Sequence, residues 1–197
     1  RKGMPPELLS QVPVLQEVLK SMEIPCIECP GFEAADILGT LSVVYEKLGH
    51  HVTLLSGDRD LLQLATEHVK ISIPKTKMSG TQIEHYYAAD VLEKYGVTPT
   101  EFIDLKALMG DASDNIPGVP GIGEKTASKI ISTYHSIEEA HAHALELKPK
   151  KASENMIAFW DQALLSKFLA AIKTDVVLDF DPEDGRIGRL LNPDSYK

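Results

Sequence analysis

The sequence contains few of the residues on which several classes of protein depend. It has only two cysteines, Cys26 and Cys29, in 197 residues, too few for the disulfide framework of a small secreted domain. Their C-x-x-C spacing is compatible with a redox pair or with half of a zinc site, but no second pair follows at zinc spacing. We expect two reduced, structural cysteines on a short strand at residues 24–29 of a cytoplasmic protein.

Long apolar runs and an excess of positive charge are also missing. No run approaches the roughly 20 apolar residues that span a bilayer, and the first residues lack the apolar core of a signal peptide, so we expect no membrane contact. Lysine and arginine number 20 against 29 aspartate and glutamate, a net charge of −9. An evenly acidic surface would disfavour nucleic acid, whereas acidic residues gathered around divalent cations would not. The net charge alone therefore does not exclude nucleic-acid binding.

What is present is an ordinary globular composition, with 43% hydrophobic and 25% charged residues. The first half alternates between helical and strand-like periodicity. The pattern predicts a helix over 6–22 kinked at Pro13, a strand at 24–29, a helix over 33–48 ended by Gly49, strands at 51–56 and 68–74 with a helix opening between them, and a turn at 79–81. This alternation predicts an α/β fold with a parallel sheet covered by helices.

From about residue 86 the apolar spacing becomes helical throughout. We therefore divide the chain into an α/β part at 1–85, an all-helical part at 86–173 with a hairpin at 116–126, and a tail or linker at 174–197. The tail starts strand-like and ends rich in charge. The stretch ENMIAFWDQALLSKFLAAI is expected to be helical, with Trp160 packed in the core beside Ile157, Leu164 and Phe168.

Three pairs of carboxylates could form one ligand site, the first two placed directly after predicted strands and the third in the helical part. In open parallel sheets, ligands bind beyond the carboxyl ends of the strands. The pairs are Glu33 with Asp36, Asp58 with Asp60, and Asp111 with Asp114. Carboxylates that converge repel one another unless cations lie between them, and oxygen ligands favour Mg²⁺ or Mn²⁺. Two such ions about 4 Å apart can carry out phosphodiester hydrolysis.

Each acidic residue also has an ordinary structural interpretation. Asp58 or Asp111, taken alone, is most simply a helix cap or a turn residue. Glu33 alone is most simply a favourable charge in the first turn of a helix. The metal-site hypothesis therefore depends on all three pairs coming together in space.

The stretch IPGVPGIGEKTA suggests an anion site next to the last of these pairs. Gly118, Gly121 and Gly123 leave their backbone amides uncovered, and the helix that starts near Glu124 directs its free N–H groups at the loop. Lys125 and Lys129 add charge and Thr126 a hydroxyl, while Val119 and Ile122 are expected to pack beneath the hairpin. Such a loop between two helices can hold a nucleic-acid backbone without reading bases. A tight helix–helix turn without a ligand is the alternative.

Four motifs together resemble one known family. GFEAADIL, LLSGDRDLLQL, LMGDASDNIPGVPGIGEKTA and IKTDVVLDF occur in order along nearly the whole chain. They resemble the 5′-nuclease domains of bacterial DNA polymerases I and, more broadly, the flap endonucleases. The resemblance implies a 5′-nuclease (PIN-like) sheet domain followed by a helix–hairpin–helix subdomain.

The resemblance also implies an activity, ligands and partners. It implies a structure-specific nuclease that removes 5′ ends and flaps, including RNA primers, in bacterial replication and repair, close to the nucleoid. The implied catalytic residues are Asp58, Asp60, Asp111 and Asp114; with Glu33 and Asp36 they would hold two Mg²⁺ or Mn²⁺. The implied DNA contacts are Gly118, Val119, Gly121, Ile122, Gly123, Lys125 and Thr126, with K⁺ at the hairpin. A polymerase domain of the same polypeptide is the expected partner.

Two departures from the family pattern bear on activity. The family has Glu-Ala-Asp-Asp where this chain has Glu33, Ala34, Ala35 and Asp36, so an expected metal ligand is lost at Ala35. The family domain also begins with a strand and further aspartates that precede the segment matching RKGMPPEL, and we expect these to be missing. Three hypotheses follow: a metal-dependent 5′-nuclease, a catalytically dead module that binds duplex or flap DNA, and an unrelated α/β protein with acidic caps.

Overall fold

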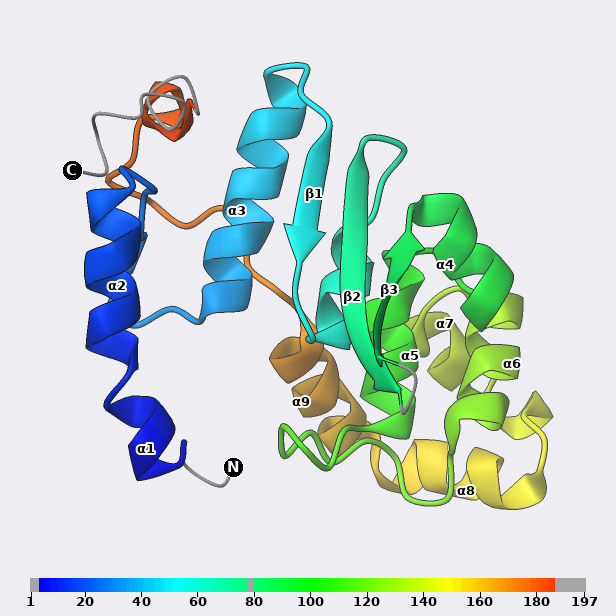
Figure 1. Cartoon of the computed structure of the whole chain (residues 1–197). Helices are drawn as coiled ribbons and strands as arrows, with labels where there is room; N and C mark the ends of the chain where they lie inside the picture. The colour runs from blue at the N-terminus through cyan, green and yellow to red at the C-terminus, as the bar shows by residue number, and fades with distance from the viewer. Residues whose placement is uncertain (1–3, 78–79, 187–197) are drawn as a thin grey trace.

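The structure is a computed structural model that describes residues 4–77 and 80–186. Figure 1 shows the elements in chain order. They are α1 (Pro6–Leu9), α2 (Val12–Ser21), α3 (Ala34–Lys47), β1 (Val52–Leu55), the 3₁₀ helix η1 (Arg59–Leu64), β2 (Val69–Lys77), β3 (Gly80–Tyr86), α4 (Ala88–Tyr95), α5 (Glu101–Met109), α6 (Glu124–Tyr134), α7 (Ile137–Ala142), η2 (Ala144–Glu146), α8 (Lys150–Ala158), α9 (Trp160–Ala170) and η3 (Pro182–Gly185). No helix in the described ranges combines the length and apolarity that crossing a bilayer requires.

The sheet confirms the α/β class but is mixed. Strand order is β1-β2-β3; β1 and β2 run parallel, with Val52 opposite Val69, as the sequence predicts. β3 pairs antiparallel to β2 with Ile71 opposite Tyr86, and the sequence analysis did not predict this strand. Its residues, GTQIEHY, are largely polar because this strand is mostly exposed, so it lacks an apolar signal. The expected turn at 79–81 lies partly outside the described residues.

The predicted strand at 24–29 is wrong. This segment has no regular secondary structure and pairs with no strand among the described residues. Pro25 has no amide hydrogen to donate to a ladder, and the segment runs between α2 and α3, away from the sheet (Figure 1). Cys26 and Cys29 on it are both free thiols.

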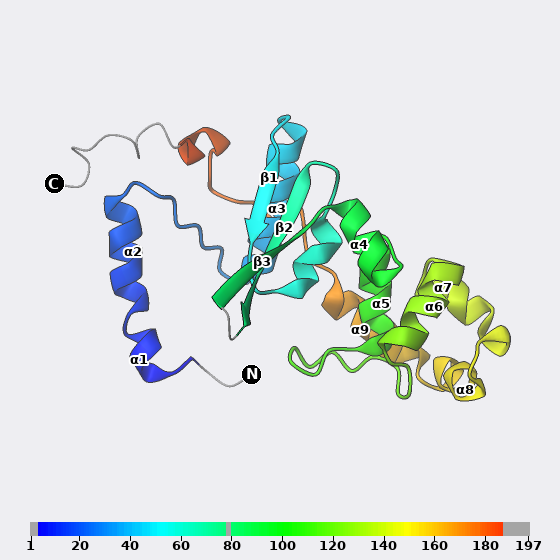
Figure 2. The ribbon, with the colours of Figure 1, turned by 45° about the vertical axis from the view of Figure 1, so that its right-hand side comes forward.

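The predicted helix over 6–22 forms as two helices instead. α1 ends at Leu9 and α2 begins at Val12, which places Pro13 in a first helical turn, where a missing amide hydrogen costs nothing. Pro13 therefore does not kink a continuous helix. α1 and α2 bury no residue, and both views show them set apart from the sheet (Figures 1 and 2).

One continuous core runs from the sheet into the helical part. Leu54 of β1 and Ile71 of β2 pack with Leu61 and Leu62 of η1, and the same cluster continues through Leu105 of α5. α5 contacts η1 of the first half of the chain as well as α6 and α9 of the helical part (Figure 2). This packing fixes the end of β1 relative to the loop that follows α5.

The helical part and the C-terminal segment differ in detail from expectation. The stretch ENMIAFWDQALLSKFLAAI breaks at Phe159 into α8 and α9, and Ile157, Leu164 and Phe168 are exposed rather than in the core. Trp160 is partly buried and stacks on His141. Residues 174–178 form no strand; the Val176 amide donates to Thr40 Oγ1 (3.1 Å), which holds the segment against α3.

Candidate metal and nucleic-acid site

The three carboxylate pairs come together at two adjoining pockets. Asp58 and Asp60 follow β1, Glu33 and Asp36 open α3, and Asp111 and Asp114 follow α5, so the sheet and α5 jointly position them. The larger pocket, about 510 Å³, is lined by Glu33, Asp36, Asp58, Asp60 and Asp114. The smaller, about 340 Å³, is lined by Asp58, Asp60, Asp111 and Asp114. Four shared residues, Asp58, Asp60, Ser113 and Asp114, join the two.

Several of these carboxylates also serve as local caps. Asp58 Oδ1 accepts from the Asp60 amide (2.9 Å) at the start of η1. Asp36 accepts from the Glu33 amide (3.1 Å) and from the Lys173 amide (2.9 Å). Asp111 Oδ1 accepts from the Ser113 amide (2.8 Å). The capping interpretation and the convergence on one site therefore hold together, because the caps orient the carboxylates.

Lys106 of α5 is a cation inside this acidic site that the sequence analysis missed. Its side chain is 5% exposed and bridges Asp60 and Asp111. Nζ lies 2.8 Å from Asp60 Oδ1, which is buried and in no hydrogen-bond geometry with any partner among the described residues. The available signal was a lone charge in the apolar run LKALM, five residues before Asp111.

The pKa shifts follow from burial and from this lysine. Burial raises the pKa of Asp60 despite the nearby Lys106 ammonium. Burial alone would lower the pKa of Lys106, but its contacts with Asp111 and Asp60 outweigh that effect and raise it. The Lys106 ammonium, and then Ser113, hold the pKa of Asp111 well below its usual range. Asp111 and Lys106 are therefore both charged at neutral pH.

The candidate ligands have the chemistry that a hard divalent cation prefers. Every ligand offered by the six positions is a carboxylate oxygen, the kind that Mg²⁺ and Mn²⁺ prefer, and the buried Asp60 Oδ1 already pairs with a cation, Lys106. In residues 4–77 and 80–186 no three or more Asp, Glu, His or Cys side chains already stand at metal-binding spacing. Lys106 occupies the space between two of the candidate ligands.

Ala35 lies where the sequence indicates a missing carboxylate. It is half-buried on the first turn of α3 and lines the larger pocket beside Glu33 and Asp36. A methyl group there contributes no ligand and no charge.

The glycine loop forms a hairpin between α5 and α6. Val119 and Ile122 are buried beneath it, as expected, so only their backbone could face a ligand. The amides of Gly118 and Val119 already donate to Ser166 Oγ (3.0 Å) and the Leu108 carbonyl (2.7 Å). In the described part of the chain the amides of Gly121 and Gly123 donate to no protein acceptor.

The loop's open side is flanked by positive charge. Lys125 is exposed and Thr126 half-buried on the first turn of α6, where the first amides of a helix have no intrahelical acceptor. Lys151 of α8 lies beside Gly121, and Asn155 of the same helix donates to the Pro120 carbonyl (2.6 Å). The candidate anion site is therefore formed by Gly121, Gly123 and the start of α6, with α8 alongside.

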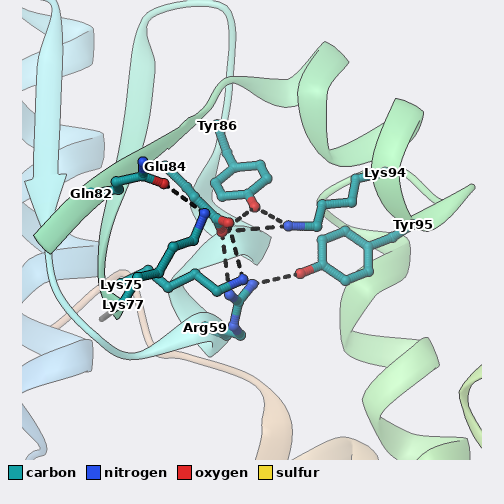
Figure 3. A network of polar contacts seen from close by, with 8 residues as sticks. All are labelled: Arg59, Lys75, Lys77, Gln82, Glu84, Tyr86, Lys94 and Tyr95. Atoms are coloured by element: carbon teal, nitrogen blue, oxygen red, sulfur yellow. Dashed lines mark hydrogen bonds and ion pairs between the residues drawn. The ribbon is translucent and has the colours of Figure 1, made fainter. Parts of the chain in front are cut away.

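Arg59, between the two acidic residues after β1, joins the site to a polar network centred on Glu84 (Figure 3). Its guanidinium donates to the Tyr95 hydroxyl (2.9 Å) and to Glu84 (3.3 Å), and Arg59 also lines the smaller pocket. Glu84 further accepts from the Tyr86 hydroxyl (2.7 Å) and pairs with Lys75 (3.4 Å) and Lys94 (3.5 Å). The network therefore holds η1, and with it Asp58 and Asp60, to β3 and α4.

We expect this network to weaken in acid through Glu84. The Tyr86 hydroxyl, with the lysines, lowers the pKa of Glu84 from 4.5 to about 2. A lowered folded-state pKa contributes stability that is fully present above about 4.5 and is lost as pH falls toward 2. The difference in unfolding free energy between wild type and Glu84→Gln, measured by urea denaturation, should therefore shrink between pH 5 and pH 2.5. A difference that stays constant over that range would contradict this assignment.

Known proteins match nearly all of this chain. Residues 1–96 match the 5′-3′ exonuclease N-terminal resolvase-like domain, and residues 97–192 match the 5′-3′ exonuclease C-terminal SAM fold. DNA polymerase I of Bacillus caldotenax is 48% identical over 184 residues, 93% of this chain but 21% of that protein. DNA polymerase I of Bacillus subtilis is 46% identical over 179 residues, 91% of this chain and 20% of that protein. The chain thus spans about a fifth of the length of these relatives.

Solved structures agree with the fold. A bacteriophage T5 flap endonuclease in complex with DNA and metal ions has a TM-score of 0.70 and 28% identity, covering 82% of this chain and 57% of that one. A T5 5′-exonuclease with divalent zinc ions bound has a TM-score of 0.67 and 27% identity, covering 85% and 62%.

Proposed function

Because this chain belongs to the 5′-3′ exonuclease family, we propose that it is the 5′-nuclease part of a bacterial DNA polymerase I. Its substrates would be DNA with a 5′ flap or nick and RNA primers on DNA, and its partner the polymerase part of the same polypeptide, in the cytoplasm at the nucleoid. The observation that carries the proposal is the convergence of three carboxylate pairs beside a glycine hairpin with uncovered amides.

The candidate ligands divide between the two pockets. Glu33 and Asp36 line only the larger one, Asp111 lines only the smaller one, and Asp58, Asp60 and Asp114 line both. Two Mg²⁺ or Mn²⁺ ions, when bound, would activate water and stabilise the charge that develops at the scissile phosphate. The chain's own caps, Asp58 on η1 and Asp36 on α3, hold the oxygens in place before substrate arrives.

The hairpin would bind the duplex at some distance from the phosphodiester that is cleaved. Backbone amides at Gly121 and Gly123 and the start of α6 suit a phosphate, with Lys125 and Thr126 at its edge. K⁺ between the loop carbonyls and a phosphate would strengthen the same contact. The hairpin and the acidic site are joined by residues 110–116, so both can engage one substrate.

A module that binds flap or duplex DNA without cutting it is the second candidate. Ala35 in the larger pocket and the absence of a ready-made cluster of three ligands in the described ranges favour it. The two candidates share the hairpin and differ only in the carboxylates.

The test is Mg²⁺- or Mn²⁺-dependent cleavage of a labelled 5′-flap duplex by wild type and by Ala35→Asp. We expect Ala35→Asp to cut at least about tenfold faster, because losing or gaining one supporting group at a metal site changes affinity or activity roughly 10- to 100-fold. Ala34→Asp is the matched control, because this substitution adds the same charge to the same turn of α3 at a residue that does not line the pocket.

Each outcome distinguishes the candidates. Faster cutting by Ala35→Asp alone supports a nuclease weakened at one ligand. Equal cutting by all three proteins would show that this position is not a ligand position. Binding of the flap without cutting by any of them would favour the binding module.

A further inference from the structure

The larger acidic pocket has a second, apolar wall that the metal hypothesis does not use. Besides the carboxylates, it is lined by Phe168, Leu169, Ala170, Ala171 and Ile172, from the end of α9 and the residues after it. The acidic part of the lining therefore suits cations and phosphate, and the apolar part suits a flat apolar group. A volume of about 510 Å³ lies within the range of small-molecule sites.

Phe168 is the unusual member of this wall. This residue is 74% exposed, although aromatic side chains gain more than most by burial. α9 buries Ala163, Ser166 and Ala170, while Lys167 reaches Asp104 (2.7 Å) and Glu138 (2.8 Å). Phe168 thus lies on the side of the helix away from the core, at the pocket, and stacks on no aromatic ring in the described residues.

We propose that Phe168 stacks on the nucleobase of the nucleotide whose phosphodiester lies at the carboxylates. This inference rests on the proposed function and names how that site holds its substrate. A nucleotide carries its charge on the phosphate and a flat π-face on the base, which matches the two walls of the pocket. Stacking tolerates any base because every base has a π-face, so the contact positions the strand without reading its sequence.

The alternative occupant of this wall is an apolar protein segment. If Phe168 packs against a protein segment, its substitution should have the same effect whether or not a given base is present in the substrate. If it stacks on a base, its substitution should weaken binding only when that base is present. Removing single bases from the substrate therefore separates the two.

The experiment measures binding of a fluorescent 5′-flap duplex by wild type, Phe168→Ala and Phe168→Trp, on the intact duplex and on a series with one abasic site at each nucleotide around the junction. We expect Phe168→Ala to bind intact flap at least about fivefold more weakly, the lower end for one base–aromatic stack, and Phe168→Trp to bind like wild type. With the abasic site at one position, wild type and Phe168→Ala should become equal. Leu165→Ala is the control, since Leu165 is also exposed on α9 but does not line the pocket.

Two results would overturn the inference while leaving the proposed function standing. One is wild-type affinity in Phe168→Ala; the other is a loss of the same size on every abasic substrate. Failure of wild type to bind any flap duplex would instead contradict the proposed function, and the stacking with it. Because Phe168 is exposed, loss of folding does not confound its substitution.

Discussion

Lys106→Met is expected to destabilise the chain by about 3–5 kcal/mol in the absence of divalent ions, the cost of removing one partner from a buried ion pair. Lys106 is 5% exposed and is the cation between Asp60 and Asp111. Without it the two carboxylates face each other in a poorly solvated site, where like charges repel strongly. Urea denaturation in EDTA at pH 7 measures the loss.

The same variant should regain stability when Mn²⁺ is added. A divalent ion that binds only the folded chain stabilises it by about 2.7 kcal/mol at 100 times its dissociation constant, and removing Lys106 opens the position between the carboxylates. We therefore expect Mn²⁺ to stabilise Lys106→Met much more than wild type, in which the ammonium and the ion compete.

Lys167→Met provides the matched control. Lys167 also bridges two acidic residues, Asp104 (2.7 Å) and Glu138 (2.8 Å), and Asp104 is buried. Its loss should destabilise the chain, but Mn²⁺ should not restore the stability because these residues line neither acidic pocket. If Mn²⁺ stabilises wild type and Lys106→Met equally, the Lys106 ammonium does not occupy the position of a divalent ion.

Gly118→Ala should be the most damaging single change in the hairpin. A Cβ there would lie 2.5 Å from the Gly110 amide nitrogen and 2.8 Å from the Leu108 carbonyl oxygen, and φ is +65°. These neighbours are backbone atoms and cannot rotate away. The left-handed conformation costs about 1–2 kcal/mol and the overpacking about 1–3 kcal/mol, so we expect a loss of roughly 2–5 kcal/mol in urea denaturation.

Two other glycines in the loop separate these causes. Gly121 has φ +79° but only ordinary contacts for an added Cβ, so Gly121→Ala should cost about 1–2 kcal/mol from conformation alone. Gly123 has open space and no positive φ, so Gly123→Ala should cost at most about 1 kcal/mol as a weaker N-cap. Similar losses in all three variants would contradict the close approach of Gly118 to Gly110.

Local signals were enough for the elements that depend on neighbours in sequence. α3 starts after Glu33 and ends before Gly49 with φ +85° as predicted, because caps and apolar periodicity act within a few residues. β1 and β2 were predicted because each carries apolar residues, of which Leu54, Val69, Ile71 and Ile73 are buried. β3 was missed because it is polar and pairs through its backbone, and 24–29 was misassigned because an apolar stretch with prolines does not show whether a partner strand exists.

For the candidate site, too, the sequence determined one part and the tertiary structure another. The three acidic pairs and the glycine hairpin were identified from residue type, spacing and place after predicted strands and helices, and from these the sequence determined the class of chemistry to look for. Whether the pairs meet was decided by the packing of α5 against η1, which no local pattern encodes.

Lys106, Arg59 and Phe168 owe their surroundings to that packing too. Lys106 pairs with two carboxylates only because the fold brings Asp60 and Asp111 next to it. Arg59 connects η1 to β3 and α4 only because these elements pack beside it. Contacts between residues far apart in sequence depend on how whole elements pack, so tertiary structure alone decided which charges are paired and which ring stands open at the pocket.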